Sequence, residues 1–98
     1  MVYFIQAADN PQGDIRIGFS TDIDERLMRH QMSSPVELWC ILLLDAPRSM
    51  ETVIHRGFRK ERRRRGKHRK LSSWFRASSD LLQFVEEMKP YGINPNEQ

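Results

Sequence analysis

The sequence predicts a small α/β (α+β) domain in which a three-stranded sheet, made of a β-hairpin and a third strand, is flanked by helices. Two short β-type runs around a turn-rich segment indicate the hairpin, and a longer apolar run between two amphipathic helix patterns indicates the third strand. The order is ββαβα, followed by a basic insert and a final helix. The 98 residues, 39% of them hydrophobic, suffice for one core. We expect one domain over residues 1–90 and a flexible tail over residues 91–98.

The hairpin is expected to join strands over residues 2–6 and 15–19. Between them, residues 9–13 are Asp-Asn-Pro-Gln-Gly, a segment rich in turn formers. Side chains alternate across a strand, so the apolar positions of the two strands share one face, whereas Tyr3 and Arg16 lie on the other. The hairpin therefore has a core face and a face that carries a phenol and a guanidinium.

Each remaining element has its own signal. Ser20-Thr21-Asp22 supplies N-cap side chains for a helix over residues 22–32. Apolar residues fill positions 38–44, which predicts a strand buried on both faces. Apolar residues at helical spacing after Pro47 predict a second helix, and Ser78 caps a last one.

The net charge of +3 hides a strong segregation of charge. Residues 1–55 hold four arginines and eight acids, residues 56–70 hold ten Lys or Arg and one Glu, and residues 71–98 hold two basic residues and four acids. We call residues 56–70 the basic segment. Within it, residues 59–70 have no apolar face, so we expect these residues to extend the second helix into solvent or to form a mobile loop. Such a cluster is typical of proteins that bind nucleic acid. The basic side chains expected to contact nucleic acid are Arg59, Lys60, Arg62, Arg63, Arg64, Arg65, Lys67, Arg69 and Lys70.

Several classes of protein are excluded. The single cysteine, Cys40, rules out an intrachain disulfide framework and a Cys-rich zinc site, and it suits a reducing compartment. No apolar run approaches the roughly 20 residues that span a bilayer, and no secretory signal precedes the first strand. We therefore expect a cytoplasmic protein with no membrane partner. The oligomeric state is not predicted by the sequence.

Five groups of residues then follow one another along the chain. They are Val2-Tyr3-Phe4-Ile5, Arg16-Ile17-Gly18-Phe19-Ser20, Arg26 with His30, Glu51 with His55, and Trp74-Phe75. Their order and spacing resemble the GIY-YIG nuclease superfamily, in its short phage-type branch with degenerate motifs. The resemblance runs from about residue 2 to residue 86.

The resemblance implies a GIY-YIG-like fold and a divalent-metal-dependent endonuclease that hydrolyses phosphodiester bonds in DNA. It implies that Tyr3 acts as the general base or relays to it, that Arg26 binds the scissile phosphate, and that Glu51 binds one metal ion. Arg16 and His30 complete the expected catalytic set. Arg26 also counts among the residues expected to bind nucleic acid.

These residue types suit the reaction on chemical grounds as well. One carboxylate, with waters and substrate oxygens completing the shell, suits Mg²⁺ or Mn²⁺, which would neutralise the charge that develops at the phosphate. A guanidinium holds a phosphate through two parallel hydrogen bonds. A phenol is a poor base at neutral pH unless cations stabilise its anion, and Arg16 would be such a cation for Tyr3.

Two other functions fit the same residues. Arg16 stands where the superfamily has the tyrosine of its second motif, and no asparagine lies near Trp74, so the chain can be a non-catalytic nucleic-acid-binding module that keeps the nuclease scaffold and the basic patch. The basic segment also suits an acidic protein partner. Single residues have structural alternatives too: Tyr3 can be a packing residue, and Arg26 can pair with Asp22.

Overall fold

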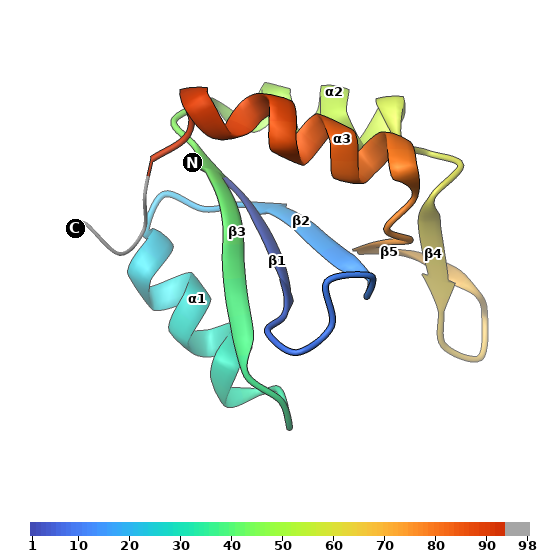
Figure 1. The fold of residues 1–98 in the computed structure, drawn as a ribbon. Coiled ribbons are helices and arrows are strands. Elements are labelled where there is room, and N and C mark those ends of the chain that lie inside the picture. The colour runs from blue at the N-terminus through green and yellow to red at the C-terminus, as the bar shows by residue number, and fades with distance from the viewer. Residues whose placement is uncertain (94–98) are drawn as a thin grey trace.

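The computed structural model describes residues 1–93, which form one five-stranded sheet with three helices (Figure 1). The elements are β1 (Val2–Ala7), β2 (Ile15–Phe19), α1 (Ile23–Met32), β3 (Leu38–Leu44), α2 (Arg48–Gly57), β4 (Arg62–Arg65), β5 (Lys70–Phe75), α3 (Ser79–Met88) and a 3-10 turn (Lys89–Tyr91). The strand order is β3-β1-β2-β5-β4, and all four neighbouring pairs are antiparallel.

The predicted three-stranded sheet in ββαβα order is wrong, because the basic segment contributes to the sheet. Residues 62–65 form β4 and pair with β5, and β5 in turn pairs with β2. The chain reverses between them at Gly66 (φ 82°) and Arg69 (φ 50°), the two residues among 1–93 with positive φ. The predicted helix extension or mobile loop is therefore wrong as well. A run of arginines has no apolar alternation to mark a strand, and only pairing with β5 makes it one.

Helices cover both faces of the sheet, so both faces are buried (Figure 1). α2 and α3 lie over the face on which the apolar positions of the first hairpin were predicted, whereas α1 lies over the other face. The first core contains Val2, Phe4, Ile15, Ile17, Leu42, Leu44, Ile54, Phe75, Leu81 and Val85. The second, smaller core contains Tyr3, Ile5, Ile23 and Leu43. The face that carries Tyr3 is thus a second core.

β3 lies at one edge of the sheet, which differs from the prediction of a strand buried on both faces. Only its last three residues, 42–44, are buried, whereas Trp39 is 56% exposed. Next to it, Ile93 donates its backbone N–H to the Leu43 carbonyl oxygen at 2.8 Å. The predicted flexible tail begins at residue 91, and its residues 94–98 lie outside the described part of the chain. No helix within residues 1–93 is long and apolar enough to cross a membrane.

Candidate functional site

The candidate site is built around an open edge of β2. β5 pairs with β2 only at Ile15 and Arg16, so residues 17–19 have a strand partner, β1, on one side only. On the open side, Nε2 of His55 lies 2.8 Å from the Ile17 carbonyl oxygen. A carbonyl can only accept, so His55 donates this hydrogen bond and replaces the missing strand partner.

Tyr3 lies across Gly18 on the α1 side of this edge. A Cβ atom at position 18 would come within 2.3 Å of the Tyr3 hydroxyl oxygen, so the phenol occupies the space that any other residue at position 18 would need. The hydroxyl oxygen lies 2.8 Å from Nε2 of His30, one of the polar residues of α1. Tyr3 itself is only 1% exposed, which places the phenol in the second core.

Two arginines surround this Tyr3–His30 pair. Within residues 1–93, the buried side-chain nitrogens without a hydrogen-bond partner are Nε of Arg16 and Nε of Arg26. A further nitrogen of Arg26 lies 3.5 Å from the Phe19 carbonyl oxygen, at the end of the open edge. A buried N–H without a partner is costly, and an oxyanion at the edge of β2 would remove that cost.

These surroundings favour the neutral form of His30. Burial lowers the pKa of His30 below its usual value of 6.5, and the positive charges of Arg16, Arg26 and Arg29 lower it further. With the imidazole neutral, Nε2 can accept a hydrogen bond from the Tyr3 hydroxyl, and it can also accept a proton.

Glu51 lies on the opposite side of the same edge. Arg48, Glu51 and His55 occupy successive turns of one face of α2. The guanidinium of Arg48 lies 4.9 Å from the centre of the Phe19 ring, and His55 contacts Ile17. The half-buried Glu51 lies between Arg48 and His55 on α2 and is therefore next to the open edge. The structure thus brings the five predicted catalytic residues to the two sides of residues 17–19.

A cationic and aromatic stripe leads from this site to the β4–β5 hairpin. Trp74 lies between two guanidiniums, with Arg16 5.8 Å and Arg65 5.6 Å from its ring. Arg65 and Arg63, two residues apart on β4, also contact one carboxylate, that of Asp14, at 3.5 and 3.1 Å. The stripe therefore runs from Arg16 through Trp74 to Arg65 of the basic segment.

A second cationic region lies on the α2 side of the hairpin. There a groove of about 590 Å³ contains no acidic residue in its lining. The groove is lined by Thr52, His55, Arg56, Arg59, Arg62, Arg64 and Leu71. Four guanidiniums without a counter-charge in one groove favour the binding of an anion.

The comparisons with known proteins give one match. A family model for the T5orf172 domain matches residues 1–89. The chain belongs to the T5orf172 domain family. No curated protein and no solved structure matches the sequence. The T5orf172 domain is an endonuclease-like family, and this membership is consistent with a nuclease or nucleic-acid-binding role.

The family match corrects the resemblance to the GIY-YIG superfamily. The T5orf172 domain is a different family from GIY-YIG, so the assignment to the GIY-YIG superfamily is wrong. The short motifs that carried the resemblance cover few residues each, whereas the T5orf172 match covers residues 1–89. The roles of Tyr3, Arg16, Arg26, His30 and Glu51 stay predictions that rest on the geometry described above.

Some functional features of the T5orf172 domain had no signal in the sequence. Asp14 is an isolated acid in a turn, and only the sheet brings it to Arg63 and Arg65. The hydrogen bond of His55 depends on where β5 leaves β2. Burial raises the pKa of the Cys40 thiol to about 11, so Cys40 is no thiolate nucleophile at neutral pH.

We expect the T5orf172 domain to lose stability as the pH falls below 6.5. The folded-state pKa of His30 is lowered from 6.5, so the unfolded chain binds this proton first. The stability contributed by neutral His30 is therefore present above pH 6.5 and is lost as the pH falls through the folded-state pKa. Urea unfolding across this range should show a weaker pH dependence for His30→Gln than for the wild type. An identical pH dependence in both proteins would contradict the assignment.

Proposed function

We propose that this T5orf172 domain is a DNA endonuclease that hydrolyses phosphodiester bonds with one divalent metal ion. The observation that carries the proposal is the pair of partnerless guanidinium nitrogens, on Arg16 and Arg26, beside a neutral histidine at an open strand edge. A scissile phosphate bound there would accept hydrogen bonds from the two guanidiniums. The arginine-rich hairpin would hold the rest of the nucleic acid.

Glu51 is the residue that would hold the metal ion. No group of three or more His, Cys, Asp or Glu side chains that could bind a metal exists within residues 1–93, which disfavours a zinc-type site. A single carboxylate fits Mg²⁺ or Mn²⁺, since these ions take most of their ligands from water and phosphate oxygens. The bound ion would supply charge neutralisation at the phosphate.

The other side chains of the site have separate roles. Arg26 and Arg16 bind and orient the phosphate through their N–H groups. Tyr3 takes a proton from the attacking water and passes its own hydroxyl proton to Nε2 of His30, 2.8 Å away. The lowered pKa of His30 keeps it free to accept that proton at neutral pH. His55 and Gly18 act indirectly, since they shape the edge of β2.

A non-catalytic nucleic-acid-binding module is the second candidate. The burial of Tyr3, at 1% exposure, favours it, because a general base must reach water. In that case Tyr3 is a core residue, and the arginines around it bind the phosphate groups of a nucleic acid that the domain does not cleave. The two candidates predict the same binding and differ in turnover.

Nicking of supercoiled plasmid DNA tests the proposal. We expect conversion to the open-circular form in Mg²⁺ or Mn²⁺ and none in excess chelator. Glu51→Gln should lower the rate about 100-fold or more, because loss of a metal or charge-stabilising group costs about 3 kcal/mol of barrier. Glu87→Gln, which changes an exposed acid on α3, should leave the rate unchanged. Nicking that survives Glu51→Gln would exclude the metal role, and binding without nicking in any metal would favour the non-catalytic module.

A further inference from the structure

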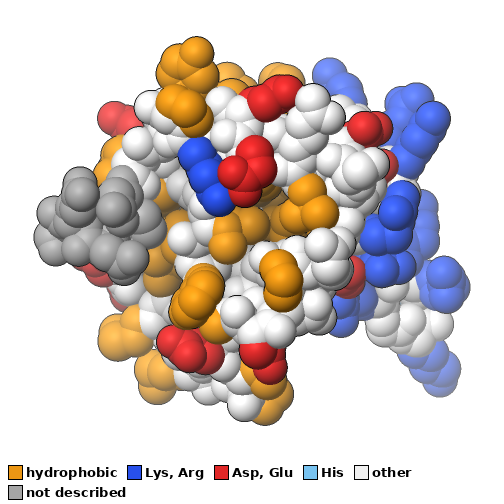
Figure 2. All heavy atoms as spheres, viewed as in Figure 1, with side chains coloured by type: hydrophobic (Ala, Val, Ile, Leu, Met, Phe, Trp, Pro, Cys, Tyr) orange, Lys and Arg blue, Asp and Glu red, His pale blue; other side chains and the backbone are white. Residues whose placement is uncertain are grey.

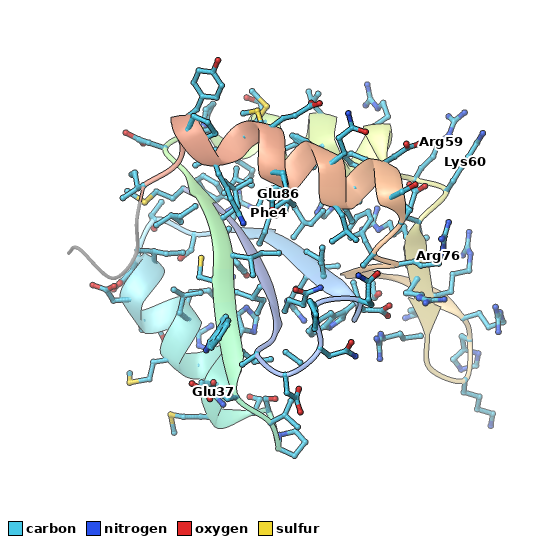
Figure 3. All side chains as sticks on the ribbon, in the orientation of Figure 1. Phe4, Glu37, Arg59, Lys60, Arg76 and Glu86 are labelled. Carbon is cyan, nitrogen blue, oxygen red and sulfur yellow. The ribbon has the colours of Figure 1, made fainter. Side chains whose placement is uncertain are left out.

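The β4–β5 hairpin projects from the body of the domain and concentrates its positive charge. It extends to one side of the sheet beyond α2 and α3 (Figure 1), and the Lys and Arg side chains gather over it at one end of the visible face (Figure 2). Arg59, Lys60 and Arg76 extend from the same side, away from Glu37 and Glu86 (Figure 3). The domain therefore presents one cationic protrusion.

The arginines of β4 are shared between the two faces of this hairpin. Arg62 and Arg64 line the groove on the α2 side. Arg63 and Arg65 contact Asp14, and Arg65 stacks on Trp74, on the other side. Strand alternation produces this division, because successive side chains of a strand point to opposite faces. Four consecutive arginines thus give two cationic faces.

Each face holds an arginine in a position that suits the binding of a phosphate. On the α2 side, Nε of Arg62 donates to the Ser72 carbonyl at 2.7 Å, which fixes the guanidinium in the groove beside Arg56 and Arg59. On the other side, Nε and Nη2 of Arg63 each lie 3.1 Å from an oxygen of Asp14. Two parallel hydrogen bonds to one carboxylate are also the geometry in which a guanidinium binds phosphate. A phosphate can therefore take the place that the Asp14 carboxylate holds in the free domain.

We propose that this hairpin enters the major groove of double-stranded B-form DNA, with its α2-side face toward one backbone and its Trp74-side face toward the other. The major groove, about 12 Å wide, admits a two-stranded β-ribbon. β4 is the edge strand of the sheet, so no neighbouring strand obstructs its entry. This inference rests on the proposed function and names its substrate as duplex DNA.

The same geometry disfavours two other substrates. An A-form RNA duplex has a deep, narrow major groove that side chains cannot read, so the hairpin would not enter it. A single strand has one backbone and can use one face only. We expect it to use the face with Trp74, since unpaired bases stack on aromatic rings.

Fluorescence anisotropy in excess chelator, which prevents cleavage, tests this inference. The probes are a DNA duplex of about 20 base pairs, one of its strands and the RNA duplex of the same sequence. The double variant Arg56→Gln/Arg59→Gln removes two charges from the groove that the α2-side face of the hairpin lines, and Arg63→Gln/Arg65→Gln removes two charges from the Trp74-side face. Arg29→Gln/Lys89→Gln removes two charges far from the hairpin and serves as the matched control.

For the DNA duplex, we expect the groove variant and the Trp74-side variant each to lower the salt slope of log affinity by about two, since each phosphate contact contributes about 0.9. Only Arg63→Gln/Arg65→Gln should weaken single-strand binding, and the RNA duplex should bind at least about tenfold more weakly than the DNA duplex. Equal binding of the two duplexes, or no effect of Arg56→Gln/Arg59→Gln on the DNA duplex, would overturn the inference. If the wild-type protein binds none of the probes, the proposed function itself fails.

Discussion

Gly18→Ala is expected to unfold or severely destabilise the domain. The added methyl group would lie 2.3 Å from the Tyr3 hydroxyl oxygen and 2.4 Å from the ring carbon that carries it, far inside the contact distance of about 3.5 Å. Both residues are buried, so neither can move into solvent. Overpacking of this kind costs about 1–3 kcal/mol, and loss of the Tyr3–His30 hydrogen bond costs about 1 kcal/mol more. For a domain of this size, the melting temperature should fall by roughly 10–25 °C.

Gly57→Ala is the matched control for this prediction. Gly57 ends α2, and a Cβ atom there would have no neighbour within 4 Å. Alanine should therefore be neutral or stabilise the domain by up to about 1 kcal/mol, because glycine costs that much in a helix. Urea and thermal unfolding of both variants measure the difference. A Gly18→Ala protein as stable as the wild type would show that Tyr3 does not occupy the space over Gly18.

The elements that the sequence predicted are those with a local signal. A run of apolar and aromatic residues marks β1, and alternating apolar residues mark β2. Ser78 accepts a hydrogen bond from the Leu81 N–H at 3.2 Å, as an N-cap should. β4 has no such signal, because its four arginines show neither alternation nor an apolar face. Its conformation depends on β5, several residues later in the chain, and that dependence is absent from any local pattern.

The residues of the candidate site could be predicted from the sequence, but its shape could not. Alternation alone places Tyr3 and Arg16 on one face, and helical spacing places Arg26 beside His30. The open edge of β2 could not be predicted, because it exists only where β5 stops pairing after Arg16. Burial of the Tyr3 face was missed for a similar reason, since α1 covers it through tertiary packing.

Arg26→Gln is expected to lower the cleavage rate by about 100- to 1,000-fold while duplex binding changes little. Removing a group that stabilises charge in the transition state costs about 3–4 kcal/mol of barrier, whereas the hairpin supplies most of the binding. Arg26→Lys should recover little activity, because an ammonium group cannot form two parallel hydrogen bonds with a phosphate. Single-turnover cleavage in Mg²⁺ and anisotropy in chelator separate the two quantities. Lys89→Gln, which removes an exposed positive charge paired with Glu86, is the control.

The pH profile of the same variant tests whether Arg26 acts on the proton acceptor as well as on the phosphate. The charge of Arg26 is one of the causes that lower the pKa of His30, after burial and Arg16. Its removal should raise that pKa, so His30 becomes protonated, and unable to accept a proton, at a higher pH than in the wild type. The acidic limb of the rate profile should therefore shift to higher pH in Arg26→Gln. If the acidic limb stays in place while the rate falls, Arg26 acts only as a phosphate ligand and does not act on His30.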